Sequence, residues 1–556
     1  MRVADAVGRG LAGLGVSTVF GVVGSGNFHV TNALVAGGAR FVAARHEGGA
    51  TVMADAWART TGSPGVVTVH QGPGLTNAMT GIAEAAKSRT PLLVLAAEAP
   101  EIRSNFHVDV AGLAAAVGAA SERLYSPASA LADAHRAYTT ALGRRTVVLA
   151  LPLNVQAAAC EPGPVPALRR TYPVAPAAEA VTALADLLRE ARRPVFIAGR
   201  GARGQAAELE RLAGACGALL ATSAVAKGLF CRSPWNLDVS GGFASPLAAE
   251  LISEADVIVG WGCSLNMWTM RHGKLIGPQA TLVQVDDDPA AIGVHRPVHL
   301  GVPGDMAQTA RAAAEALASE GSREEAGRET RPVRDQESGY RSGAVRERIA
   351  GQVRWRDVPY QDEGDGERID PRTLSIALDD LLPAERTVAV DSGNFMGYPS
   401  MYLSVPDEAG FCFTQAFQSI GLGLATAVGA AVARPDRLTV AALGDGGALM
   451  GVSELETVAR LGLPMVVVVY DDEAYGAEVH HFGPHGDPLD TVRFPPADLA
   501  AIGRGFGFEG VTVRGPGDLA AVRGWLDGPR ERPLLIDAKV TSAHGSWWLE
   551  EAFRGH

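Results

Sequence analysis

The sequence predicts an α/β protein made of three doubly wound domains, each built on a parallel sheet. Short apolar runs alternate with longer helical patterns through three stretches of the chain, and a Pro-rich and a charged segment separate these stretches. Strands that alternate with helices pair in parallel and form an open sheet that is covered on both faces. We therefore predict domains at residues 1–160, 176–320 and 369–556, with a charged connector at 321–368.

The composition is that of a globular protein. The chain has 556 residues, of which 47% are hydrophobic and 20% charged, so it can bury several cores. Its net charge of −12 argues against a nucleic-acid partner, because phosphate binding requires clustered Lys and Arg. No apolar run reaches the ~20 residues that span a bilayer, the N-terminal pattern lacks the apolar core of a signal peptide, and the cysteines are scattered. We expect a cytoplasmic protein with no membrane partner.

Five apolar runs predict the strands of the first domain. Glu47 follows the second run and begins a helical pattern rich in small residues, in the stretch RHEGGATVMADAWARTTG. The helix dipole favours a carboxylate in a first helical turn, and this is the simplest interpretation of Glu47. The five runs are residues 16–24, 39–45, 65–70, 90–98 and 145–152.

The central domain is predicted to be Rossmann-like. The turn GRGARG (199–204) follows an apolar run and spells G-x-G-x-x-G, which invites a dinucleotide-binding interpretation and, with it, a hydride-transferring dehydrogenase. The next run, 217–223, ends without the acidic residue that would hold a ribose, so we interpret the turn as structural. Bound nicotinamide or flavin would favour the dehydrogenase. The predicted strands are residues 193–199, 217–223, 255–262 and 280–288.

The third domain carries acidic residues where two of its predicted strands end. Asp445 ends one strand, and Asp471 and Asp472 end the next. The carboxyl ends of parallel strands face one crevice, where two carboxylates suit magnesium. A tight turn beside an acidic surface loop is the alternative. The strands are residues 387–393, 437–447, 463–472 and 532–540, and the glycines that would let the backbone approach a phosphate are Gly444, Gly446 and Gly447.

The segment GDGG…YDD (444–472) resembles the thiamine-diphosphate motif, which starts with GDG and usually closes with two asparagines. The chain as a whole is similar to the acetolactate synthase, benzoylformate decarboxylase and pyruvate decarboxylase family. The order of the domains is also similar: a pyrimidine-binding domain first, a central domain, and a diphosphate-binding domain last. The resemblance implies thiamine diphosphate and Mg²⁺ as cofactors.

The resemblance also implies which residues of the third domain hold these cofactors. Asp445, Asp472 and the backbone carbonyl of Ala474 would be the magnesium ligands, although Asp472 stands where the family usually has asparagine. Ile420 matches the bulky residue that props the cofactor into a bent shape, and the Gln418 carbonyl would accept from its aminopyrimidine. The loop that touches the diphosphate would hold Gly393, Asn394 and Phe395. Ordinary helix–sheet packing is the alternative for these last two groups.

Glu47 matches the one glutamate that the family places after the second strand of its first domain. A carboxyl group that bonds to the pyrimidine ring favours the imino form of the neighbouring amine, which removes the proton from the thiazolium carbon. In the family, one cofactor lies between the first domain of one chain and the last domain of another. The resemblance therefore implies a homodimer or homotetramer.

The implied reaction is decarboxylation of a 2-oxo acid, followed by carboligation of the enamine to a second carbonyl of an aldehyde or ketone. A non-oxidative decarboxylase that releases an aldehyde and a non-catalytic cofactor-binding relative are the alternatives. Four polar residues match catalytic positions or lie beside them, and they are Ser25, His70, Gln71 and Glu478. His107 is a further residue that could line the pocket.

Two departures from acetolactate synthases weaken the expectation of a flavin-containing enzyme. Where those enzymes usually have Phe-Gln, this chain has Ala111 and Gly112. Where their central domain usually has a stretch like RFDDR, this chain has GCSLNMWTMRHG (262–273). The resemblance permits FAD but does not favour it, and it does not name the substrates.

Overall fold

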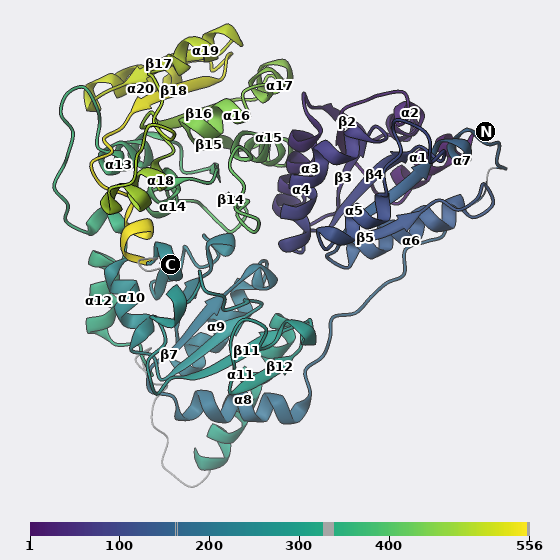
Figure 1. The fold of residues 1–556 in the computed structure, drawn as a ribbon. Helices are drawn as coiled ribbons and strands as arrows, with labels where there is room; N and C mark the ends of the chain where they lie inside the picture. The colour runs from purple at the N-terminus through teal and green to yellow at the C-terminus, as the bar shows by residue number, and fades with distance from the viewer. Residues whose placement is uncertain (162, 164, 326–338, 553–556) are drawn as a thin grey trace.

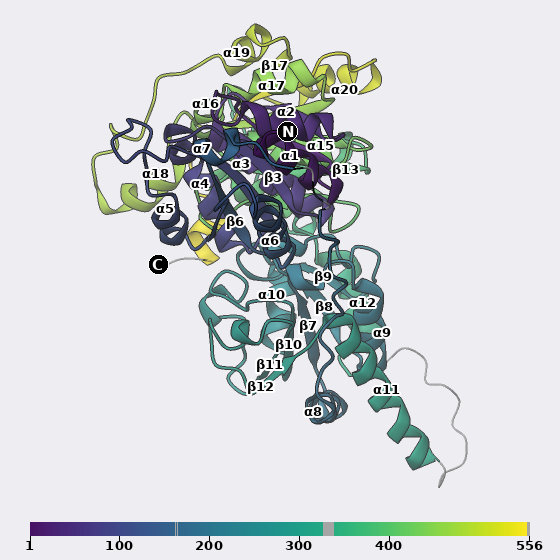
Figure 2. The same cartoon turned by 90° about the vertical axis from the view of Figure 1, so that its right-hand side faces the viewer.

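Each of the three domains is built on a six-stranded sheet in which every pairing is parallel, as the alternation of apolar runs and helices predicts. The computed structural model describes residues 1–161, 163, 165–325 and 339–552. The first and third domains lie side by side and the central domain lies below both (Figures 1 and 2). None of the helices in the described ranges has the length and apolar content needed to cross a membrane.

The first domain has the strand order β2-β1-β3-β4-β6-β5. Its inner strands are buried on both faces and consist mainly of Val, Leu and Ala, as parallel strands covered by helices require. The strands are β1 (Thr18–Gly21), β2 (Arg40–Ala43), β3 (Gly65–Val69), β4 (Leu92–Glu98), β5 (Ala120–Arg123) and β6 (Thr146–Pro152). The helices are α1 (Val3–Gly13), α2 (Phe28–Ala36), α3 (Glu47–Thr61), α4 (Pro73–Lys87), α5 (Val110–Ala116), α6 (Ala130–Leu142) and α7 (Leu153–Ala157).

The third domain repeats this topology, with the order β14-β13-β15-β16-β18-β17. Its strands are β13 (Arg386–Val390), β14 (Phe411–Phe413), β15 (Leu438–Gly444), β16 (Met465–Asp471), β17 (Glu509–Val513) and β18 (Leu534–Lys539). Its helices are α13 (Pro371–Leu381), α14 (Gly397–Tyr402), α15 (Gly423–Ala433), α16 (Asp445–Met450), α17 (Glu454–Leu461), α18 (Gly476–Phe482), α19 (Leu499–Gly505) and α20 (Leu519–Asp527).

The central domain has a different order, β12-β11-β10-β7-β8-β9. This is the strand order of Rossmann folds, with two halves wound outward from the neighbouring strands β7 and β10. The strands are β7 (Pro194–Ala198), β8 (Leu219–Thr222), β9 (Asn236–Val239), β10 (Val257–Trp261), β11 (Thr281–Asp286) and β12 (Leu300–Pro303). The helices are α8 (Ala178–Glu190), α9 (Ala206–Cys216), α10 (Pro246–Ser253), α11 (Met306–Glu325) and α12 (Gly343–Gln352).

The predicted charged connector, 321–368, includes segments that pack on the central domain. Ile349 of α12 and Tyr340 are buried, and the Tyr340 hydroxyl donates to the Leu251 carbonyl at 3.0 Å. Residues 326–338 of the connector lie outside the described residues. The structure therefore attaches residues 340–353 of this segment to the central domain, whereas Trp355 and Val358 pack against the core of the third domain.

The first and third domains meet through equivalent helices. α3 follows the second strand of its sheet and α15 follows the second strand of the other sheet. The two helices pack against each other (Figure 1), and residues of both belong to one continuous hydrophobic core. This contact fixes how the two domains that carry the predicted site residues lie within one chain.

Candidate functional site

A cavity opens at the carboxyl ends of β15 and β16, where the sequence predicts the metal site. In the register of the sheet Gly444 lies opposite Tyr470, so the next residues, Asp445 and Asp471, are level with each other. The cavity has a volume of about 310 Å³. Residues that line it include Asp445, Gly446, Leu449, Asp471, Tyr475 and Phe494. Acidic, glycine and aromatic residues therefore share one crevice.

The predicted ligands Asp445 and Asp472 differ from the neighbouring Asp471 in whether a cationic side chain neutralises the carboxylate. Asp471 forms a buried ion pair with Lys539, whereas neither Asp445 nor Asp472 forms an ion pair with any Lys or Arg that the structure describes. Burial, and then the charge of Asp471, raises the pKa of Asp445 to about 7. Burial, with the charges of Asp445 and Asp471, raises the pKa of Asp472 to about 8. A buried carboxylate beside a half-buried one, neither paired with a Lys or Arg among the described residues, is an environment in which a divalent cation would supply the missing positive charge.

The loop after β16 is held in place by backbone bonds to residues 492–494. The Tyr475 N–H donates to the Val492 carbonyl at 2.8 Å, and the Phe494 N–H donates to the Glu473 carbonyl at 2.8 Å. Ala474 lies between these two bonds, so its carbonyl has a fixed position. Among the described residues no group of three or more His, Cys, Asp or Glu side chains is arranged to hold a metal. Two carboxylates and a backbone carbonyl remain as a ligand set for Mg²⁺, which usually keeps waters and phosphate oxygens as its other ligands.

Glycines allow the predicted cofactor segments to approach one another. A Cβ atom at Gly447 would lie 2.3 Å from Oδ2 of Asp391, and one at Gly476 would lie 2.3 Å from Oδ2 of Asp472. The Gly476 position also lies 3.3 Å from Asn394, so the loop 393–395 borders the metal-ligand loop. A Cβ atom at Gly447 would also lie 3.3 Å from Cγ2 of Ile420. The predicted residues of the third domain therefore gather around one crevice.

Asp391 is a residue of this crevice that sequence reasoning missed. It is fully buried, and its carboxylate accepts from the Gly421 N–H at 3.0 Å and the Leu422 N–H at 3.2 Å. Burial raises its pKa to about 6. It thus anchors the loop that carries Gln418, whose φ of 59° lies in the left-handed region. The sequence feature that could have identified Asp391 is its position directly after the apolar run TVAV.

The C-terminal segment also reaches the crevice, which the sequence did not indicate. The Ser546 N–H donates to Oδ1 of Asn394 at 2.9 Å, and Nε1 of Trp548 donates to the Asn394 carbonyl at 3.0 Å. Asn394 is thereby fixed from two sides. Glu478 lies partly buried in the first turn of α18, six residues after Asp472, and so belongs to the same group.

A second group of predicted residues lies at the carboxyl edge of the first sheet. Glu47 begins α3 and is partly buried, and its Oε2 accepts from Nδ2 of Asn77 at 3.1 Å. The Gly26 N–H donates to Nδ1 of His70 at 3.2 Å, which brings His70 beside the loop that holds Ser25. Gln71 packs against the same loop, and its buried Oε1 has no hydrogen-bond partner among the described residues.

Within one chain, α3 contacts the third domain at both of its ends. At the start of the helix, the backbone N–H groups of Arg45 and His46 donate to Glu454 of α17 at 3.1 Å. At its end, Arg59 donates to the Phe413 carbonyl, on the segment that leads to Gln418. The contacts of α3 with the third domain therefore extend over twelve residues of helix, or about 18 Å.

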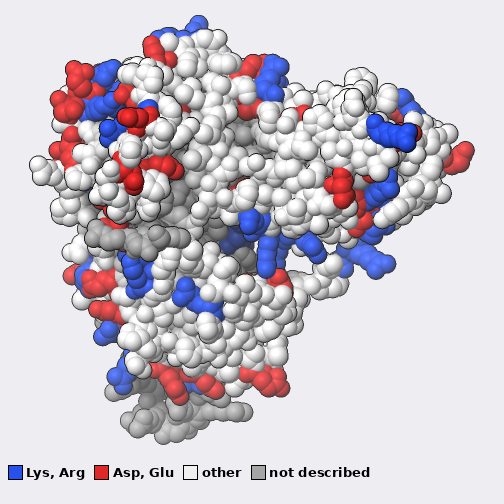
Figure 3. Space-filling view, viewed as in Figure 1, with Lys and Arg blue, Asp and Glu red and all other residues white. Residues whose placement is uncertain are grey.

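The two unusual segments of the central domain pack against the other domains. Arg200 of the GRGARG turn donates to the Ser88 carbonyl, and Arg203 donates to the Arg59 carbonyl at 2.6 Å. Lys and Arg side chains gather where the first and central domains meet (Figure 3). In the stretch 262–273, Arg271 donates to the Gly241 carbonyl at 3.0 Å and lies 4.5 Å above the Trp547 ring. Both segments are thus used in contacts between domains.

The sequence matches three parts of one enzyme family. Residues 1–117 match the N-terminal TPP binding domain of thiamine pyrophosphate enzymes, residues 181–313 match their central domain, and residues 391–538 match their C-terminal TPP binding domain. The matches cover most of the chain and follow the order of its three sheets.

The chain is also similar over most of its length to enzymes with different activities. A Pseudomonas aeruginosa protein named probable 2-ketoarginine decarboxylase AruI is 29% identical, with 93% of this chain and 89% of that protein covered. The acetolactate synthase isozyme 2 large subunit of Escherichia coli is 29% identical, with 86% and 84% covered. A sulfoacetaldehyde acetyltransferase of Alcaligenes xylosoxydans is 28% identical, with 84% and 80% covered. Because these names describe different reactions, the similarity does not select one of them.

Proposed function

The chain belongs to the thiamine pyrophosphate enzyme family, and from that premise we propose that it decarboxylates a 2-oxo acid and joins the remaining fragment to a second carbonyl compound. The observation that carries the proposal is the crevice of the third domain. There, a buried and a half-buried carboxylate, neither with a cationic side-chain partner in the described part of the chain, lie beside a glycine-rich helix start and the loop at Asn394. This combination of groups fits a magnesium diphosphate.

The residues of the third domain would hold the cofactor as follows. Asp445, Asp472 and the Ala474 carbonyl would bind Mg²⁺, and the Gln418 carbonyl and Ile420 would hold the aminopyrimidine and the bent shape. When bound, thiamine diphosphate supplies the electron sink for carbanion chemistry. The residues that would approach its diphosphate are Gly393, Asn394, Phe395, Gly444, Gly446 and Gly447.

Glu47 would act from the first domain of a second chain. Its carboxyl group would hydrogen-bond to the pyrimidine ring and control the protonation of the amine beside it. The resemblance implies a cofactor that lies between the first domain of one chain and the last domain of another, which supports a site that two chains complete. A homodimer, alone or within a homotetramer, is the smallest assembly that meets this requirement.

Four polar residues would act on the substrate. Ser25, His70 and Gln71 would face it from the first domain, and Glu478 from the third. Gln71 is the best supported by geometry, because its buried Oε1 lacks a partner within the described part of the chain. Glu478 would donate or withhold the proton that decides whether an aldehyde leaves or a second carbonyl is joined.

The test is a screen of 2-oxo acids by the purified protein with thiamine diphosphate and Mg²⁺, with and without aldehyde acceptors. The acids would include pyruvate and 2-ketoarginine, the acceptors would include sulfoacetaldehyde, and products would be identified by mass. Loss of CO₂ with formation of a ligated product supports the proposal. Release of an aldehyde alone would identify a non-oxidative decarboxylase, and bound cofactor without turnover would identify a non-catalytic relative.

A further inference from the structure

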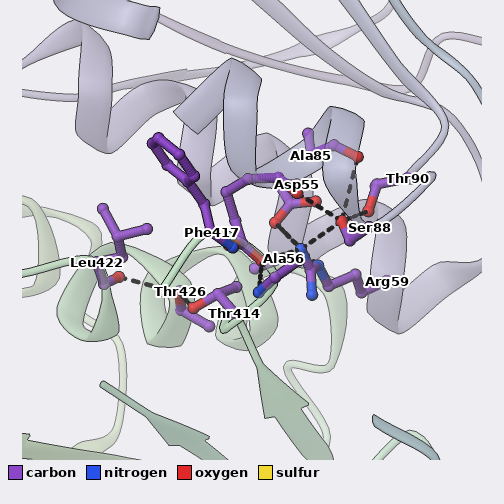
Figure 4. Close-up of polar contacts among 12 residues, drawn as sticks. Asp55, Ala56, Arg59, Ala85, Ser88, Thr90, Thr414, Phe417, Leu422 and Thr426 are labelled. Carbon is purple, nitrogen blue, oxygen red and sulfur yellow. Dashed lines mark hydrogen bonds and ion pairs between the residues drawn. The ribbon is translucent and has the colours of Figure 1, made fainter. Parts of the chain in front are cut away.

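A buried cluster of charged side chains lies in the first domain at its boundary with the third (Figure 4). Arg59, in the last turn of α3, has 8% of its surface exposed. Its guanidinium pairs with Asp55 at 2.8 Å and with Glu84 of α4 at 2.7 Å. Burial by itself would lower the pKa of Arg59. The charges of Asp55 and Glu84 outweigh this effect and raise the pKa, so Arg59 stays fully charged. Such a cluster is costly to bury, so its remaining contacts are informative.

The remaining contacts of the cluster cross to the third domain. Oε1 of Glu84 accepts from the Ala416 N–H at 3.0 Å, and Oε2 accepts from the Phe417 N–H at 2.6 Å. Nη1 of Arg59 donates to the Phe413 carbonyl at 2.9 Å. Three backbone groups between residues 413 and 417 are therefore held by two side chains of another domain. Hydrogen bonds to ionised groups are about twice as strong as neutral ones.

The segment held in this way leads directly to the loop of Gln418 and Ile420. Beyond that loop, the Asp391 carboxylate accepts from the backbone of Gly421 and Leu422. The loop is thus anchored by a buried carboxylate on each side, while Ile420 at its tip is 37% exposed. Gln418 is held between the anchors in a left-handed conformation, which determines the direction of its carbonyl.

We propose that Glu84 is a positioning residue for the cofactor: by holding two consecutive amides of the third domain, it sets the Gln418 carbonyl and the Ile420 side chain for the aminopyrimidine of thiamine diphosphate. This inference rests on the proposed function. It also gives α3 and α4 a role in two sites of a dimer. Glu47 at the start of α3 serves a site shared with the partner chain, and Arg59 at its end supports the loop of its own chain.

The geometry distinguishes this role from domain packing alone. Both oxygens of the Glu84 carboxylate are used on adjacent amides, so the side chain fixes the orientation of the two peptide planes on either side of Ala416, directly before Phe417 and Gln418. Asp55 provides the contrast within the same cluster. It is equally buried and also pairs with Arg59, yet its contacts stay within the first domain.

The experiment compares Glu84→Asp and Glu84→Gln with Asp55→Asn as the matched control. Glu84→Asp keeps the negative charge but is one methylene shorter, so it cannot hold both amides. Thiamine diphosphate affinity is measured in the presence of Mg²⁺ by quenching of tryptophan fluorescence, and exchange of the Ala416 and Phe417 amides is measured in the cofactor-free protein. We expect both Glu84 variants to bind the cofactor about tenfold more weakly and to exchange these amides faster. Asp55→Asn should lower the melting temperature but bind the cofactor like the wild type.

Two outcomes would overturn the inference. One is cofactor affinity and amide exchange in the Glu84 variants equal to those of the wild type, and the other is an equal loss of affinity in Asp55→Asn. A wild-type protein that does not bind thiamine diphosphate at all would instead overturn the proposed function, and with it the role of the loop. Should Glu84→Gln fail to fold, Glu84→Asp decides the question, because it keeps the charge that Arg59 requires.

Discussion

The carbonyl oxygen of Met53 in α3 lies 2.2 Å from the position that a Cβ atom at Gly429 of α15 would occupy. Glycine at 429 therefore allows the backbones of two helices from different domains to touch. The two helices are equivalent elements of two sheets with the same strand order. Their contact sets the distance between the domain that carries Glu47 and the domain that carries Asp445.

Replacing this glycine should weaken the junction of the two domains. Gly429→Ala adds a methyl group where there is no space, and we expect a loss of about 1–3 kcal/mol in the free energy of unfolding. Thermal unfolding would show a lower melting temperature. Gly524→Ala is the control, because Gly524 lies inside α20 and a Cβ atom there would meet nothing within 4 Å. The control should gain about 0.5–1 kcal/mol. Equal behaviour of the two variants would contradict the packing argument.

The buried strands of all three sheets could be predicted from the sequence, whereas most edge strands could not. Every strand that sequence reasoning missed lies at the edge of its sheet: β5, β9, β12, β14 and β17. An edge strand has one neighbour and is covered less completely, so it does not need a long apolar run. β5, for example, reads Ala-Ser-Glu-Arg. The one edge strand predicted, β2, owes this to the apolar residues that precede Glu47.

The candidate site divides in the same way between local and long-range features. The segments around Asn394, Ile420, Asp445 and Asp472 are recognisable from short motifs, and the structure places them around one crevice. The contact of Ser546 with Asn394 spans 152 positions, and that of Glu84 with Phe417 spans 333. No local pattern encodes such pairs, because they depend on how whole domains pack.

Substitution of Glu47 should separate catalysis from binding. Glu47→Gln keeps the size of the side chain and its contact with Asn77 but cannot exchange a proton with the pyrimidine ring. We expect thiamine diphosphate affinity and melting temperature to change little, and kcat for a 2-oxo acid to fall about 10²–10⁴-fold. Isothermal titration with the cofactor and CO₂ release measure the two quantities. Near-normal turnover would refute the assignment of Glu47.

Mixing two inactive variants tests whether two chains complete one site. In a dimer of one Glu47→Gln chain and one Asp445→Ala chain, shared sites would leave one site with both substitutions and the other with neither. Random re-association of equal amounts should therefore restore about a quarter of the wild-type rate. Each variant re-associated with itself is the control and should stay inactive. If both groups served the same chain, the mixture would also stay inactive.

Magnesium binding should depend on pH because of the two carboxyl groups that would hold it. A group with a pKa near 7 or 8 is mostly protonated at pH 6 and mostly ionised above pH 8, and only the ionised form binds the metal. We expect the affinity for Mg²⁺, measured with saturating thiamine diphosphate, to rise about tenfold or more from pH 6 to pH 8. Asp472→Asn removes one of the two carboxyl groups that lose a proton in this range, so the affinity for Mg²⁺ should rise less steeply with pH. A chelator should release the cofactor from the wild type, and retention in its presence would argue against the site.

Substitution of Glu478 should change what becomes of the substrate fragment. Glu478 lies in the first turn of α18, directly after the loop of the proposed metal ligands, and is partly buried. Glu478→Gln can donate a hydrogen bond but cannot transfer a proton, so protonation of the fragment to an aldehyde should slow relative to ligation. We expect the ratio of aldehyde to ligated product, measured by mass spectrometry, to fall several-fold together with kcat. Glu509→Gln, at an exposed position of the edge strand β17, is the control and should keep both values. If Glu478→Gln also kept both, Glu478 would have no part in the reaction.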